Sequence, residues 1–224
     1  MAAPRHGPGQ TLRPARPAGP GGLASAQRLL DAADVLVTGY RPGAVETLGL
    51  ELPPGTVRAR VSAWRGLGVD PGPWAGRRGF DSIVQAASGI AMIESGDGST
   101  PGALPVQALD HATGYLLAAA VVDALTDRRA DRRGRDVDAS LARTAAWLLA
   151  TQGRRPGLVG AAGGPTTVPP PDRRLTTSCR VGADGPLVTT ARPALADVDD
   201  HPWPAHPWGT DEPSWQDGPA AAQG

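Results

Sequence analysis

Proline and glycine are concentrated at the two ends of this chain, and only the middle can form long regular elements. The chain has 24 prolines and 30 glycines among 224 residues, and they are dense in residues 1–22 and 153–224. Proline removes a backbone donor and glycine adds backbone freedom, so such segments rarely sustain helices or strands. We therefore expect a disordered leader over 1–22, one folded domain over 23–152, and an irregular tail rich in Pro, Gly and Trp over 153–224.

The middle segment alternates between helical and strand-like patterns. Residues 23–33 carry apolar side chains at three- and four-residue spacing, and a short β-branched run at 34–38 follows directly. Residues 57–62 form a second strand-like run. Short apolar runs between helices are typical of strands buried on both faces of a parallel sheet. The pattern predicts an α/β domain with an open, mostly parallel, Rossmann-like sheet and flanking helices, incomplete and with irregular ends.

Two acidic residues precede strongly apolar helical patterns. Asp81 is expected to cap a helix whose inner face carries Ile83, Val84, Ala87 and Ile90. Asp110 is expected to lie just before an apolar helix over about 112–126, with a solvated turn at 127–135. Residues 136–140 predict a short strand or cap, and a last helix begins at residue 141.

Charge and cysteine content exclude several functions. The 22 basic and 22 acidic residues balance, which argues against nucleic acid or an anionic membrane as the main partner. Every basic residue is arginine, so Schiff-base chemistry on lysine is excluded. Cys179 is the single cysteine, the N-terminus has no apolar signal region, and no His, Cys and acidic residues have metal-ligand spacing. We predict a cytoplasmic protein without a metal site.

Four motifs follow one another in the middle segment. They are ADVLVTGYRPG at 33–43 with LGL at 48–50, RGFD at 78–81 with QA at 85–86 and SG at 88–89, LD at 109–110 with GY at 114–115, and RRGRDVDASL at 132–141. In this order and spacing they resemble the motifs of family III CoA-transferases. That group includes formyl-CoA and carnitine CoA-transferases and α-methylacyl-CoA racemase. The resemblance covers about residues 28–150 and neither end.

The resemblance implies a nucleophile and a substrate-binding surface. By analogy, Asp110 attacks an acyl-CoA thioester, and the chain moves CoA to a second carboxylic acid. Gly39, Tyr40, Arg41 and Arg78 occupy positions where the family contacts CoA, which would be a substrate and not a permanently bound cofactor. The family forms intertwined dimers, so the resemblance also implies a homodimer or a companion subunit that covers exposed surface.

Other interpretations of the same residues stay open. Asp is a favoured helix cap, and an aspartate in this position often does no more than cap. The chain is shorter than members of the family, so it could be a non-catalytic remnant or an accessory subunit of a CoA-transferase. A racemase is less favoured, because the racemase branch has a proton-transferring histidine where this chain has Phe80.

Overall fold

The computed structural model describes residues 20–40, 45–65, 72–151, 174–181, 185–193 and 213–215. The chain divides into two compact units. One comprises residues 30–166, and the other comprises residues 1–29 together with 167–224. The unit of residues 30–166 contains all four motifs, and the predicted boundaries at 22/23 and 152/153 stay a prediction.

A parallel three-stranded sheet forms the centre of the first unit. Its strands are β1 (Val35–Thr38), β2 (Val57–Ser62) and β3 (Asp136–Ser140), in the spatial order β1-β2-β3. The register places Val35 opposite Val57 and Arg58 opposite Asp136. Parallel neighbours require crossover connections, and helices supply them between β2 and β3. The predicted α/β class with a parallel sheet and flanking helices is confirmed.

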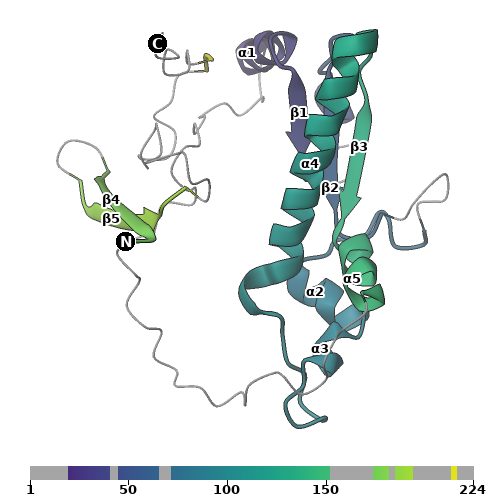
Figure 1. The fold of residues 1–224 in the computed structure, drawn as a ribbon. Helices are drawn as coiled ribbons and strands as arrows, with labels where there is room; N and C mark the ends of the chain where they lie inside the picture. The colour runs from purple at the N-terminus through teal and green to yellow at the C-terminus, as the bar shows by residue number, and fades with distance from the viewer. Residues whose placement is uncertain are drawn as a thin grey trace. The chain divides into compact units, whose positions relative to one another are not determined.

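The long helix α4 (Ala108–Asp131) runs along one face of this sheet, opposite in direction to the strands. It therefore begins at the edge of the sheet where the strands end, and the shorter helices α2 (Asp81–Ala87), α3 (Ile90–Ile93) and α5 (Leu141–Ala150) lie at the same end (Figure 1). Two single-turn 3-10 helices, η1 (Glu46–Leu48) and η2 (Pro105–Gln107), complete the connections. The beginning of α4 is thus placed at the carboxyl edge of the sheet.

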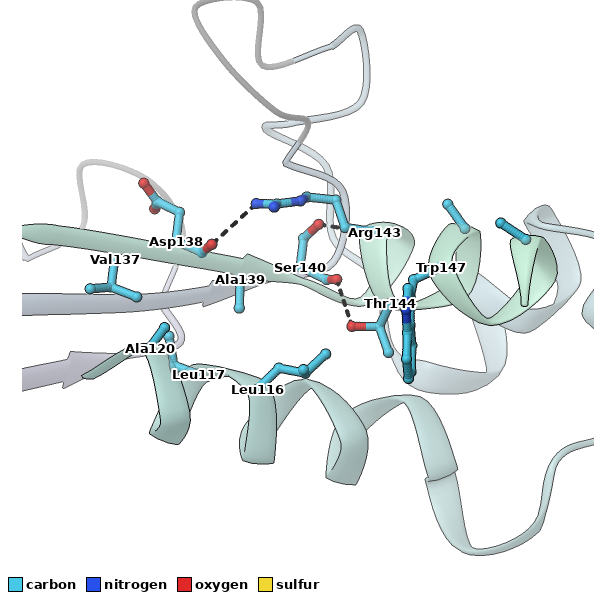
Figure 2. A pocket seen from close by; sticks show the side chains of 12 residues that line it. Leu116, Leu117, Ala120, Val137, Asp138, Ala139, Ser140, Arg143, Thr144 and Trp147 are labelled. Carbon is cyan, nitrogen blue, oxygen red and sulfur yellow. Dashed lines mark hydrogen bonds between the residues drawn. The ribbon is translucent and has the colours of Figure 1, made fainter. Parts of the chain in front are cut away.

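The two faces of the sheet differ in chemistry. Val137 and Ala139 of β3 point toward α4, while Asp138 points away from it (Figure 2). On the face away from α4, the guanidinium of Arg58 donates two hydrogen bonds of 2.8 Å to the carboxylate of Asp136. Arg60 binds Asp138 in the same bidentate way at 2.8 and 3.0 Å. Period-two alternation therefore gives one apolar face and one face with a ladder of ion pairs.

The buried core lies at the carboxyl edge of the sheet. Trp64 and Leu148 are among its partly buried neighbours. Five buried residues from the four helices α2, α3, α4 and α5 form it: Val84, Ile90, Leu109, Leu141 and Ala145. Leu109 is 1% exposed and belongs to the first turn of α4. Core contacts therefore fix the position of the residue that follows it.

Two helices differ from the sequence-based expectation. Helix α4 begins at residue 108 instead of 112, and it continues to 131 through the expected turn. Ion pairs at its end, between Arg135 and Asp131 and between Arg128 and Asp34, favour this longer helix.

The inner face of α2 was also predicted wrongly in part. Val84 and Ile90 are buried, but Ile83 and Ala87 are exposed, and Gln85 is buried in their place. The helix ends after two turns, and Gly89 follows with a left-handed φ of 83°. The expected stripe required one continuous helix, and this break turns α3 in a new direction.

The second unit contains most of α1 (Pro20–Asp31) and a two-stranded antiparallel hairpin. Strand β4 (Thr176–Arg180) pairs with β5 (Leu187–Ala191), and the indole of Trp215 donates a 3.1 Å hydrogen bond to the carbonyl of Leu29. The expectation of an irregular tail is wrong for these ten strand residues. The expected leader up to residue 19, and Trp203 and Trp208, lie outside the described residues.

One helix of the described chain, η2 with α4 (Pro105–Asp131), is long and apolar enough to cross a membrane by length and composition alone, with a mean hydropathy of 1.2. Helices that pack against the core of a soluble protein meet the same criterion, and α4 packs against β2 and β3. The cytoplasmic location stays a prediction.

Candidate active site

The carboxyl edge of the sheet brings several predicted site residues to one end of the first unit. Gly39 and Tyr40 follow β1 directly, and Asp110 lies in the first turn of α4, which starts at the same edge (Figure 1). In open parallel sheets, ligands bind outside the carboxyl ends of the strands. Arg78 lies in the segment leading into α2, and Arg41 lies outside the described residues.

Asp110 is the third residue of α4, not a residue before the helix. Its side chain is exposed to solvent, and within the described residues it accepts no hydrogen bond and forms no ion pair. Asp110 therefore does not act as the helix cap that the sequence left open as an alternative. The N–H groups at the start of α4 have a different acceptor.

That acceptor is Asp81, whose side chain is 1% exposed. One carboxylate oxygen, Oδ2, accepts the backbone N–H groups of Leu109 at 2.8 Å and Asp110 at 3.0 Å. The other, Oδ1, accepts the side-chain amide of Gln85. We expected Asp81 to cap its own helix, but the residue before α2 is Phe80 and no side chain caps that helix. Asp81 instead caps α4, a helix that starts 27 residues later in the chain.

The environment of Asp110 makes its carboxylate more basic than an ordinary aspartate. Burial of part of the side chain raises its pKa, the nearby Asp81 raises it further, and His111 lowers it. A more basic carboxylate is a stronger nucleophile, provided that it stays ionised at the working pH. The exposed position leaves the carboxylate accessible to a reactant.

The backbone leading into α4 adopts an uncommon conformation. Val106 and Gln107 have φ values of 49° and 53°, in the left-handed region. A β-branched residue such as valine rarely adopts this region, at a cost of about 1–3 kcal/mol. Such residues are frequent at functional sites because the surrounding structure must hold them in place. Sequence analysis missed this feature, since neither residue is a glycine.

The proposed CoA contacts are exposed. Tyr40 is 74% exposed, and its backbone N–H is bound by the hydroxyl of Thr38 at 3.3 Å. Gly39 lies close to Val61, whose Cγ1 would be 3.3 Å from an added Cβ atom. The guanidinium of Arg78 is on the surface, while its carbonyl accepts the indole N–H of Trp64 at 3.0 Å. These side chains are accessible to a ligand, and their role stays a prediction.

An aromatic cluster beside Arg78 was not anticipated. The rings of Trp64 and Trp74 meet edge to face with centroids 4.9 Å apart, and the guanidinium of Arg77 lies 5.5 Å from the ring of Trp74. Gly79 allows this arrangement, because an added Cβ atom would lie 2.6 Å from the indole nitrogen of Trp64. The Arg-Gly-Phe-Asp motif thus has a structural role in addition to any role in binding.

An apolar groove of about 590 Å³ lies between α4, β3 and α5 (Figure 2). Leu116, Leu117 and Ala120 line it from α4, and Trp147 lines it from α5. The hydroxyl of Thr144, a lining residue, is 2.7 Å from the hydroxyl of Thr113, and both residues are buried. Asp110 is not among the lining residues. The groove suits an apolar group better than the charged end of CoA.

Within the residues that the structure describes, no group of three or more His, Cys, Asp or Glu side chains is placed to hold a metal ion.

A family model described as CoA-transferase family III matches residues 17–177. The chain is 34% identical to the probable fatty acyl-CoA transferase Rv3272 of Mycobacterium tuberculosis over 131 residues, which are 56% of this chain and 32% of that protein. It is 30% identical to the succinyl-CoA–L-malate CoA-transferase alpha subunit of Chloroflexus aurantiacus over 129 residues, 54% of this chain and 29% of that subunit. The chain therefore matches only about a third of the length of these relatives.

Solved structures share the fold. An aspartate-to-alanine mutant of Rv3272 superposes with a TM-score of 0.55 at 29% identity, covering 64% of this chain and 40% of that one. A CAIB/BAIF family protein from Brucella suis superposes with the same TM-score at 24% identity, covering 61% of this chain and 36% of that one.

Proposed function

Because this chain belongs to CoA-transferase family III, we propose that it transfers CoA between an acyl-CoA and a carboxylic acid, with Asp110 as the nucleophile. The observation that carries the proposal is the Asp110 carboxylate at the carboxyl edge of the sheet. It is exposed, it accepts no hydrogen bond within the described residues, and its pKa is raised by burial and by Asp81. These properties suit a carboxylate that must attack a thioester.

The proposed reaction conserves atoms and charge over four steps. The Asp110 carboxylate attacks the thioester carbonyl, the C–S bond breaks, and CoA leaves as a thiolate to give an aspartyl–acyl anhydride. The thiolate then attacks the aspartyl carbonyl, which releases the first carboxylate and leaves an aspartyl–CoA thioester. The acceptor carboxylate attacks the carbonyl of that thioester, the C–S bond breaks, and CoA leaves again as a thiolate to give a second anhydride between Asp110 and the acceptor. Finally, the thiolate attacks the acceptor acyl group, which yields the new acyl-CoA and restores Asp110.

In this proposal CoA is bound as a substrate, at the same edge of the sheet. Gly39 and Tyr40 would lie against its adenosine end, and Arg41 and Arg78 would bind its phosphates, because a guanidinium offers a planar fork of donors. The exposure of Tyr40 and Arg78 supports this assignment. No permanently bound cofactor is required by the reaction.

We also propose that a second copy or a companion subunit covers part of α4. Tyr115 is 70% exposed, and Leu116 and Val122 on the same helix are also exposed. Such a run of exposed apolar side chains is typical of a contact surface. Two relatives from Chloroflexus aurantiacus are named as the alpha and beta subunits of one CoA-transferase, which supports assembly as a feature of related enzymes.

A second candidate is a non-catalytic remnant or accessory subunit. The observation that favours it is the length of the match, which covers only 32% of Rv3272. This candidate predicts that the chain alone does not bind CoA in a calorimetric titration. Micromolar binding would count against it. A racemase is disfavoured, because the phenyl ring of Phe80 cannot exchange a proton.

The test of the nucleophile uses Asp110→Asn, which keeps the size of the side chain and removes its charge. We expect CoA transfer to fall by at least about 10³-fold, since the covalent intermediate cannot form. The natural chain, incubated with an acyl-CoA and hydroxylamine, should yield a hydroxamate at residue 110 by mass spectrometry. The matched control is Asp123→Asn, an exposed aspartate of the same helix, which should keep full activity. Full activity in Asp110→Asn would refute the assignment.

A further inference from the structure

A buried carboxylate lies directly against the backbone of the proposed nucleophile. Asp81 is almost fully buried, and its two oxygens accept three N–H donors, from Leu109, Asp110 and Gln85. All three hydrogen bonds end on the carboxyl oxygens of Asp81 at the positive end of α4, where an acidic side chain is favoured. Resting on the proposed function, we propose that Asp81 is a positioning residue that holds the first turn of α4 and keeps its N–H groups away from the Asp110 carboxylate.

Two carboxylates, Asp81 and Asp110, lie close enough to the start of α4 to compete for its free N–H groups. The first N–H groups of a helix have no partner within it and bind a nearby acidic side chain where one is available. Asp110, in the first turn itself, would be such a side chain. A carboxylate that accepts backbone N–H groups is stabilised as an anion and loses nucleophilicity. Because Asp81 accepts the N–H groups of Leu109 and Asp110, the Asp110 carboxylate stays without these donors.

Side-chain hydrogen bonds also make the first turn of α4 rigid. The amide of Gln85 donates to Asp81, and its oxygen Oε1 accepts the backbone N–H of Leu104 at 2.7 Å. One side chain thus connects Asp81 to the segment that enters η2, where Val106 and Gln107 have left-handed φ values. These bonds, with the burial of Leu109, fix both sides of the turn that carries Asp110. A fixed nucleophile reacts faster because less freedom is lost on reaching the thioester.

Two charged or titratable groups act on Asp110. Asp81 reaches it from α2 and raises its pKa, and His111, the next residue of α4, lowers it. The adjoining η2 consists of Pro105, Val106 and Gln107, none of which titrates, and α5 contributes Leu141 and Ala145 to the adjacent core. Removal of the Asp81 charge should therefore lower the pKa of Asp110.

The decisive variant is Asp81→Asn in the full chain. Asparagine keeps the size of the side chain, but its neutral amide oxygen binds the two N–H groups of α4 more weakly, so the Asp110 carboxylate can compete for them. The pKa of Asp110 is followed by carboxyl ¹³C NMR, and its signal is assigned by its absence in Asp110→Asn. We expect a downward shift of this pKa, together with a fall in kcat of about tenfold or more and a nearly unchanged KM. Asp123→Asn, the matched control on the same helix, should leave the pKa of Asp110, kcat and KM unchanged.

Each result supports or overturns the inference. An unchanged Asp110 pKa in a folded Asp81→Asn protein overturns it, while the proposed function stands. Full activity of Asp110→Asn overturns the proposed function instead, whatever the titration shows. Asp81→Ser is the second variant, since serine is a favoured helix cap without charge. If neither Asp81 variant folds while Asp123→Asn does, Asp81 is a structural cap only and the inference fails.

Discussion

Replacement of Leu109 by alanine tests whether core contacts anchor the turn that carries Asp110. Leu109 is 1% exposed and lies in the core cluster with residues of α2, α3 and α5. Burial of a leucine side chain contributes about 2 kcal/mol, and the cavity left by its removal adds to this loss. Since several elements form the walls of the site, it can collapse only in part. We expect the free energy of unfolding to fall by about 3–4 kcal/mol.

Leu116→Ala is the matched control, because it makes the same chemical change on the same helix. Its side chain is 47% exposed and lines the open groove, so its truncation leaves no closed cavity. We expect a loss below about 1 kcal/mol. Urea unfolding, followed by circular dichroism, gives both values. With a slope of about 2 kcal/mol/M, the midpoint should fall by about 1.5–2 M for Leu109→Ala and by less than about 0.5 M for the control.

Equal midpoints for the two variants would refute the reasoning. That result would mean that Leu109 contributes no more to the free energy of unfolding than the exposed Leu116 does. The position of Asp110 would then depend on Asp81 alone.

Three further predictions follow from particular contacts. Gly134→Ala should lower the melting temperature and cost about 1–3 kcal/mol, because an added Cβ would lie 2.5 Å from the carbonyl oxygen of Thr56. Gly114→Ala should instead raise the melting temperature and increase the free energy of unfolding by up to about 1 kcal/mol. Nothing lies within 4 Å of the added Cβ atom, and alanine favours a helix. Stability should also fall in acid, because hydrogen bonds from arginines of β2 lower the pKa values of Asp136 and Asp138. The contribution of these two carboxylates to stability is complete above the unfolded pKa of about 3.9. It is lost as pH falls through their pKa values in the folded protein. In thermal melts between about pH 2 and 6, Asp138→Asn should weaken the dependence of the melting temperature on pH. The same dependence as in the natural chain would contradict this prediction.

The sequence alone determined the elements whose signals are local. The strand-like run at 57–62 is β2, and the β-branched run at 34–38 contains β1. Ser140 ends β3 and also caps α5, as the pattern at 136–141 predicts. Alternation in a strand and a capping hydroxyl at a helix start depend on neighbouring residues, so they are visible in the sequence. The four motifs likewise identify the family, and with it Asp110 as the candidate nucleophile.

Only the tertiary structure decided how the candidate site is built. Asp81 looks like the cap of its own helix, yet it caps α4, because the chain returns after 28 residues and places the N–H group of Leu109 within reach. Gln85 is buried for the same reason, and α4 starts four residues earlier than its apolar pattern indicates. A cap between distant segments leaves no periodic signal, since its two partners meet only when the elements are assembled.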